Sequence, residues 1–226
     1  MKISKLMTTA MLAGGLMIGA TSVQAQVEAS ANVSLATDYV WRGVSQTNED
    51  PAIQGGFDLG FGPGFYVGTW GSNVDFGDVE NLELDFYGGW STEFSNGLGL
   101  DLGVIHYHYF ADDNNVDFEE LYAGLSYGPV SAKVSWDPDN KNTYLEAGIE
   151  HEFKDIVTVS AHVGTYMFDT EFAPGTDSYT DWSLGVSKEI GGFGFALTYY
   201  DTNGDGNTFG GKNADSRVVF AISKDL

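Results

Sequence analysis

The chain of 226 residues contains 32 acidic and 10 basic side chains, so its formal net charge at neutral pH is −22. A protein of this charge repels phosphate groups, and we therefore expect no nucleic-acid partner. Because the sequence contains no cysteine, disulfide bonds, thiolate catalysis and zinc–thiolate sites are excluded.

The first 25 residues have the features of a secretory signal peptide. Two lysines precede an apolar run over residues 6–20, and Val23-Gln24-Ala25 is a cleavage site of small residues. This run is shorter than the roughly 20 apolar residues of a transmembrane helix. We predict cleavage at the end of that tripeptide, which leaves residues 26–226 as a single exported domain.

Apolar and polar side chains alternate strictly from Val33 to Arg42. This period of two is typical of a strand whose faces meet different surroundings. We expect the face that ends in Tyr39 and Trp41 to meet lipid, since aromatic belts border the apolar band of membrane barrels. On the other face we expect Asp38 and Arg42 to lie within reach of each other in an aqueous interior.

Five blocks of the sequence resemble the TorF porin family. Three lie near the start, at 38–47, 51–58 and 64–75, and two lie later, at 120–129 and 199–202. The resemblance implies a Gram-negative outer-membrane β-barrel that acts as a channel. It implies neither a substrate nor catalytic residues.

The same alternation recurs along the rest of the chain, near residues 53–61, 65–73, 82–94, 98–104, 120–127, 130–136, 144–153, 157–167, 182–186, 193–199 and 217–223. These segments are joined alternately by short turns and by longer acidic loops. The short turns lie near 63, 96, 129, 155 and 191, and the longer loops lie near 43–51, 75–80, 110–117, 137–142, 168–178 and 201–214. Short turns on one rim and long loops on the other are typical of outer-membrane barrels. We therefore predict an all-β, antiparallel transmembrane barrel of about 12 strands, with short periplasmic turns and longer acidic extracellular loops.

The inward faces of these strands predict an acid-rich interior, and an acidic wall favours cations. We expect Lys133 and Arg217 to set the interior field together with Glu120 and Glu146, and inward glycines such as Gly103 to leave space for a bore. The predicted pore-lining residues are Asp38, Arg42, Asp58, Glu83, Asp85, Asp101, Glu120, Tyr122, Lys133, Glu146, Glu150 and Arg217. In the alternative, the carboxylates pair with the few basic groups and with Tyr66, Tyr87, Tyr122 and Tyr144, and fill the interior.

Two motifs could hold a metal ion. Asp201, Asn203 and Asp205 match the start of a calcium loop, but Lys212 stands where an EF-hand has a bidentate glutamate. A flexible acidic surface loop is the alternative interpretation of that segment.

The second motif is a pair of histidines, His106 and His108, which share a face at the mouth of a strand. They could bind a metal ion with Asp112 or Asp113. A position in the membrane-interface belt is the alternative.

Other side chains suggest further chemistry. His151 is expected to face lipid, as the catalytic histidine of outer-membrane phospholipases does, although no serine or asparagine aligns beside it. Tyr107 and Tyr109 are expected inside the barrel, where they could stack on a sugar or an aromatic solute.

The leading hypothesis is a passive, small-bore, cation-preferring diffusion channel for small solutes, located in the outer membrane after export through the periplasm. The alternative is a non-conducting structural or surface-interaction barrel whose acidic loops bind divalent cations or lipopolysaccharide. We expect no enzymatic activity and no cofactor. The expected partners are outer-membrane lipid, lipopolysaccharide, the barrel-assembly machinery and small solutes or cations.

Overall fold

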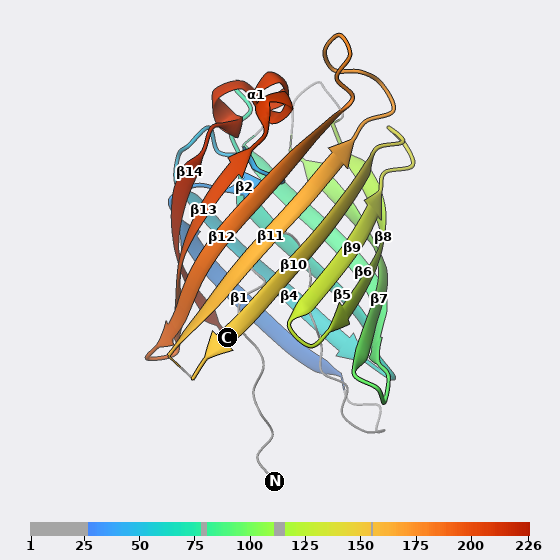
Figure 1. Cartoon of the computed structure of the whole chain (residues 1–226). Helices are drawn as coiled ribbons and strands as arrows, with labels where there is room; N and C mark the ends of the chain where they lie inside the picture. The colour runs from blue at the N-terminus through green and yellow to red at the C-terminus, as the bar shows by residue number, and fades with distance from the viewer. Residues whose placement is uncertain (1–26, 78–80, 111–115, 155) are drawn as a thin grey trace.

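Each long strand pairs with its neighbour in sequence, and the first strand, β1 (Glu28–Ala36), also pairs with the last, β14 (Arg217–Asp225), so the antiparallel sheet closes on itself. The computed structural model describes residues 27–77, 81–110, 116–154 and 156–226 (Figure 1). The strands between are β4 (Ala52–Phe61), β5 (Phe65–Asn73), β6 (Leu82–Glu93), β7 (Leu98–Tyr109), β8 (Phe118–Tyr127), β9 (Val130–Trp136), β10 (Thr143–Phe153), β11 (Val157–Met167), β12 (Ser178–Ile190) and β13 (Phe193–Thr202). The prediction of a 12-stranded antiparallel barrel is confirmed.

The two faces of the barrel wall differ in polarity. Every wall strand exposes large apolar side chains outward, among them Leu35, Ile53, Val67, Phe86, Leu102, Leu121, Val134, Leu145, Val159, Leu184, Leu197 and Phe220. The opposite faces carry buried polar side chains, among them Ser34, Asp58, Ser72, Glu83, Glu120, Ser135 and Asp181. A protein in water rarely exposes so continuous an apolar surface, whereas a barrel in a bilayer requires one.

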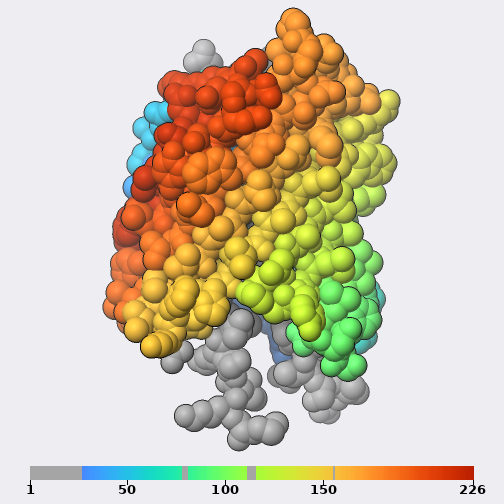
Figure 2. All heavy atoms as spheres, in the orientation of Figure 1, coloured from blue at the N-terminus to red at the C-terminus, as the bar shows by residue number. Residues whose placement is uncertain are grey.

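The two rims of the barrel also differ. Short turns join the strands at the rim where the C-terminus lies, and the longer connections stand at the other rim (Figure 1). The longer connections include a short helix, α1 (Gly204–Gly210), followed by the 3-10 turn η1 (Gly211–Ala214). Figure 2 shows these red residues beside the orange β11–β12 loop, above the barrel wall. The predicted signal peptide lies outside the described residues.

No helix within the described ranges is long and apolar enough to cross a membrane.

The first strand ends earlier than predicted. β1 stops at Ala36, and residues 37–51, here called the inward loop, turn into the barrel interior. The prediction that Tyr39 and Trp41 face lipid is therefore wrong: Tyr39 is only 6% exposed, and Trp41 packs edge-to-face on the interior ring of Tyr107. The alternation of polar and apolar residues continues through Arg42, six residues past the end of the strand.

A tight hairpin forms the centre of the inward loop. β2 (Val40–Trp41) pairs with β3 (Val44–Ser45), and the two residues between them, Arg42 and Gly43, have φ angles of 48° and 79°. Positive φ at both central residues is the requirement of a type I′ turn, which favours glycine at the second position. A Cβ atom on Gly43 would lie 2.6 Å from atoms of both Asp181 and Thr202, so the tip of the hairpin rests against β12 and β13.

We expect Gly43→Ala to lower the free energy of unfolding by about 2 kcal/mol or more, because alanine adds backbone strain at positive φ and overlaps the wall. Urea titration of the protein purified in detergent micelles measures this change. Gly62→Ala is the matched control, since Gly62 also has a positive φ of 60° but no atom lies within 4 Å of the position that a Cβ atom would take. Equal losses in the two variants would show that close packing against Asp181 and Thr202 contributes nothing to the stability.

Candidate functional site

The barrel interior is the candidate functional site, because the predicted pore-lining side chains converge there. The wall strands carry ten of them on their inward faces: Asp58, Glu83, Asp85, Asp101, Glu120, Tyr122, Lys133, Glu146, Glu150 and Arg217. Asp38 and Arg42 reach the interior from the inward loop instead of from a wall strand. That these residues line an open bore stays a prediction.

A buried ion pair joins the inward loop to the wall. Arg42 Nη2 lies 2.7 Å from Glu120 Oε2, and the two side chains are 5% and 3% exposed. The guanidinium carbon also lies 4.1–4.6 Å from the ring centroids of Trp41, Tyr144 and Tyr166. Aromatic faces attract a cation, so the arginine is compensated both by a carboxylate and by the surrounding rings.

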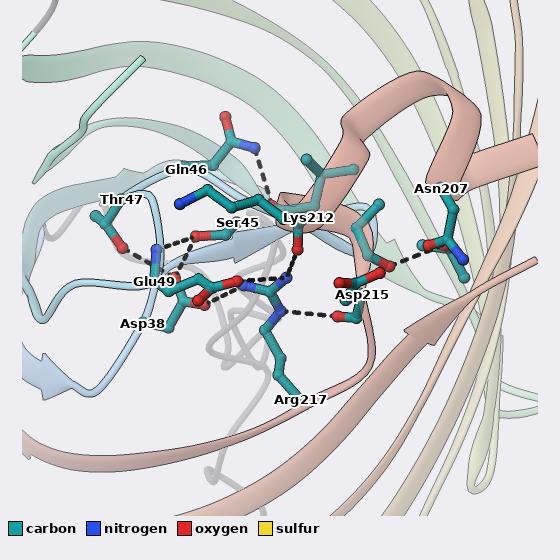
Figure 3. A network of polar contacts seen from close by, with 12 residues as sticks. Asp38, Ser45, Gln46, Thr47, Glu49, Asn207, Lys212, Asp215 and Arg217 are labelled. Carbon is teal, nitrogen blue, oxygen red and sulfur yellow. Dashed lines mark hydrogen bonds and ion pairs between the residues drawn. The ribbon is translucent and has the colours of Figure 1, made fainter. Parts of the chain in front are cut away.

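A second ion pair holds the base of the inward loop. Arg217 Nη1 lies 2.8 Å from Asp38 Oδ2, and the hydroxyls of Ser45 and Thr47 donate to Asp38 Oδ1 at 2.6 and 2.9 Å (Figure 3). Arg217 also donates to the backbone oxygen of Lys212 at 3.0 Å. This network connects the inward loop, the last strand and the η1 turn.

The prediction that Asp38 and Arg42 contact each other is wrong. The chain reverses at Arg42, so its side chain crosses to β8 while Asp38 stays beside β14. The prediction that Arg217 acts together with Glu120 is also wrong, because Glu120 forms its ion pair with Arg42 and Arg217 forms one with Asp38.

The inward loop contacts several sides of the wall. Tyr39 donates a hydrogen bond to Glu83 of β6 at 2.9 Å, and Tyr179 of β12 donates to the backbone oxygen of Arg42 at 3.0 Å. Together with the ion pairs to β8 and β14, these contacts spread around the barrel. The inward loop therefore crosses the interior and narrows it.

Tyrosines satisfy most of the remaining interior carboxylates. A phenol donates one hydrogen bond, which reduces the cost of holding a carboxylate away from water. The pairs are Tyr87 with Asp58 at 2.5 Å, Tyr66 with Asp101 at 2.7 Å and Tyr144 with Asp181 at 2.9 Å. This pairing agrees with the alternative in which tyrosines and carboxylates fill part of the interior.

The inward glycines do not all leave open space. A Cβ atom on Gly103 would overlap the ring of Tyr122, and one on Gly68 would overlap the ring of Tyr87. These glycines make room for a tyrosine from the neighbouring strand, so the expectation that they widen the bore is wrong at both positions. At Gly124, by contrast, the nearest atom would be 3.8 Å away.

A further polar network lies on β9 to β12. Lys133 Nζ lies 2.8 Å from Glu146 Oε1, as the expected role of this pair in the interior field requires. His162 extends this network from β10 to β12, because its Nε2 atom lies 3.2 Å from Glu146 Oε2 and its Nδ1 atom lies 3.5 Å from Asp181 Oδ1. No role was expected for His162 from the sequence, although its position between outward Ala161 and Val163 places it inside.

The interior has an excess of negative groups where the inward loop meets β6. Asp85 lies two residues from Glu83 on the same face of that strand, and both are at most 4% exposed. Among the described residues, Asp85 Oδ1 has no hydrogen-bond partner, and the same holds for Arg42 Nη1. Buried polar atoms of this kind usually bind water or an ion.

The motif proposed as a calcium loop begins a helix. Asn203 caps α1, where its side-chain oxygen accepts from the backbone N–H of Gly206 at 3.1 Å and of Thr180 at 3.2 Å. Asn203 Nδ2 donates to Asp205 at 3.2 Å, while Asp201 belongs to β13. The segment interpreted from the sequence as an acidic surface loop therefore contains helix, and the capping preference of asparagine accounts for the pattern. Calcium binding by these residues stays a prediction.

The remaining candidates lie on separate surfaces. His151 is on the outer face, 4.6 Å from the ring of Phe153, and its partner on β11 is Val159. Tyr107 points inward as expected, but Phe118 stacks on it at 4.4 Å and covers its face. Tyr107 therefore offers no free ring to a sugar.

A closed 12-stranded barrel with an apolar outer face, a polar interior and a loop folded inward defines a porin-like barrel. The chain belongs to the family Gcw_chp, described as "Bacterial protein of unknown function", whose sequence profile matches residues 20–225. The TorF name stays a prediction. No curated protein matches the sequence.

Solved porins share the fold. The KdgM porin is 8% identical with a TM-score of 0.58, and the NanC porin is 9% identical with the same score. Each alignment covers 87% of this chain and 98% of the porin. A second KdgM structure, in complex with disordered oligogalacturonate, is 8% identical with a TM-score of 0.57, over 86% of this chain and 98% of that one. At these identities the similarity shows the fold.

We expect Glu120→Gln to lower the free energy of unfolding by about 3 kcal/mol, because it leaves the buried Arg42 guanidinium without its counter-charge. Urea titration in micelles measures the change. Lys141→Ala is the control: its ion pair with Asp169 is 3.8 Å long and largely exposed, so a loss under about 1 kcal/mol is expected. A loss at Glu120 no larger than that of the control would contradict the structural role of the buried pair.

Proposed function

We propose that the protein is a passive, small-bore diffusion channel of the outer membrane that passes small solutes and prefers cations. The observation that carries the proposal is a closed barrel, apolar outside, whose interior holds more carboxylates than basic groups. The similarity of its fold to solved porins supports the channel class.

The inward loop sets the bore in this proposal. Arg42 and Glu120, which it brings together, are 5% and 3% exposed, whereas Lys133 and Glu146, on other strands, are 22% and 16% exposed. Glu150, nearer the short-turn rim, is also partly exposed. In this proposal the narrowest level therefore lies at the inward loop.

The charged side chains of the interior determine the proposed preference for cations. The interior basic groups Arg42, Lys133 and Arg217 each pair with a carboxylate at 2.7–2.8 Å, so they contribute little free positive charge. The carboxylates Asp58, Glu83, Asp85, Asp101, Glu150 and Asp181 face no such partner among the described salt bridges of Lys and Arg. A negative wall raises the local concentration of cations. Polyanions such as the oligogalacturonate of the KdgM complex are disfavoured by the same field.

The second candidate is the non-conducting barrel. The observation that favours it is the burial of the inward loop over residues 38–47, where only Trp41 is partly exposed and where the contacts run from β6 to β14. In that case the acidic long loops would be the working surface, binding divalent cations or lipopolysaccharide. Export by the segment 1–25 and assembly into the outer membrane belong to both proposals.

Planar-bilayer recording in a salt gradient tests the channel. We expect steady single-channel conductance and a reversal potential of the sign that cations produce. The double change Glu83→Gln with Asp85→Asn should lower the cation-to-anion permeability ratio about threefold, because it removes two carboxylates at the narrow level. Glu171→Gln on a long loop is the control and should leave the ratio nearly unchanged. Anion preference in the unmodified protein would contradict the proposed selectivity.

Replacement of residues 40–45 by a Gly-Ser-Gly linker tests the inward loop. We expect a severalfold rise in single-channel conductance, because the hairpin no longer crosses the interior. Heat-modifiable migration on a gel confirms that the variant is folded. If only the variant conducts, the non-conducting barrel becomes the better account of the natural protein.

A further inference from the structure

Metal-ligand side chains gather on the outer face of the barrel, at the long-loop ends of β7 and β8 (Figure 1). His106 and His108 lie two residues apart on β7, so they point to the same side as the exposed Val104. Asp117 immediately precedes β8, and Glu119 is the cross-strand partner of His106. This group is separate from the interior described above.

The group is compact enough to share one ion. One ligand atom from each of His106, His108 and Asp117 lies within 4.8 Å of the other two. Among the described residues, no other three acidic or histidine side chains come this close together. The imidazoles are nearly parallel, with centroids 6.2 Å apart. Ligand atoms bound to zinc at about 2.0–2.1 Å lie roughly 3.3 Å from each other, so small side-chain rotations suffice.

Hydrogen bonds already orient both histidines. His106 Nδ1 lies 3.0 Å from Glu119 Oε1, and His108 Nδ1 lies 2.7 Å from Asp117 Oδ2. A carboxylate in the position of Glu119 fixes the ring and tautomer of a metal-binding histidine and leaves Nε2 of His106 free to coordinate. The contact between His108 and Asp117 is different, because both side chains offer ligand atoms and an ion would lie between them. Both rings are more than a third exposed, so an ion can reach them.

Both carboxylate oxygens of Asp117 have partners in this group. Its Oδ1 atom accepts a hydrogen bond from the Tyr109 backbone N–H at 2.9 Å, and its Oδ2 atom lies 2.7 Å from His108 Nδ1. A carboxylate beside two imidazoles is the donor set of a borderline divalent cation. Calcium and magnesium, in contrast, prefer oxygen ligands alone.

We propose that His106, His108 and Asp117 bind one zinc ion, or a similar divalent transition-metal ion, on the outer face at the long-loop rim. Water completes the coordination. The site differs from the one expected from the sequence, because Asp117 takes the place assigned to Asp112 or Asp113, which lie outside the described residues. It does not depend on whether the barrel conducts.

Isothermal titration with ZnCl2 tests the site, using the protein purified from outer membranes in a zwitterionic detergent. Excess MgCl2 occupies the acidic loops, so that the remaining heat reports on nitrogen-containing sites. We expect one zinc ion per chain, and a loss of affinity of roughly tenfold or more in His106→Ala, His108→Ala and Asp117→Asn. His151→Ala, an outward histidine on another strand, is the matched control and should bind zinc like the unmodified protein.

A cobalt titration of the unmodified protein provides a measurement that needs no variant. Visible absorption bands of four- or five-coordinate cobalt that disappear on adding zinc would support the site. Zinc affinity and stoichiometry unchanged in the His106→Ala, His108→Ala double variant would overturn the proposal, as would the absence of any zinc binding over magnesium. Either result would show that the group is a pair of histidine–carboxylate hydrogen bonds only.

Discussion

Burial of the Arg42 guanidinium determines how the interior is arranged. A charge held away from water must be compensated close by, and Arg42 is compensated by Glu120 at 2.7 Å and by three aromatic faces. To bring the arginine to that place, the chain must leave the wall after Ala36 and reverse at Gly43 against β12 and β13. The type I′ turn, the narrow level of the interior and the contacts of the inward loop all depend on this one requirement.

The interior acids are accommodated by two different means. Three basic side chains each neutralise one carboxylate directly, and tyrosines from neighbouring strands donate hydrogen bonds to several others. The tyrosine rings lie over glycines such as Gly103, which links the high glycine content to the polar interior. Hydrogen bonds from phenols satisfy a carboxylate without a basic side chain, so most of the interior polar groups are paired although basic groups are few.

The same alternation that builds the interior also builds the outside. Because successive side chains of a strand point to opposite faces, each inward carboxylate or tyrosine is flanked by outward residues. Over most of the wall those residues are apolar, as lipid requires. At the long-loop ends of β7 and β8 they are histidines and carboxylates, which pair with one another and suit the polar boundary of a membrane better than its apolar band.

Local patterns predicted the number of wall strands and most of their faces, although β7 and β12 are longer than the predicted segments 98–104 and 182–186. Leu82–Glu93 alternates so regularly that its faces and length follow from the sequence, and the inward placement of Glu83 and Asp85 follows with them. The end of β1 and the path of residues 37–51 could not be predicted, because alternation continues through Arg42 unchanged. Their partners, Glu120 and Arg217, lie 78 and 179 residues away from Arg42 and Asp38. Only closure of the barrel brings these groups together, so tertiary structure alone decided which face of that stretch became interior.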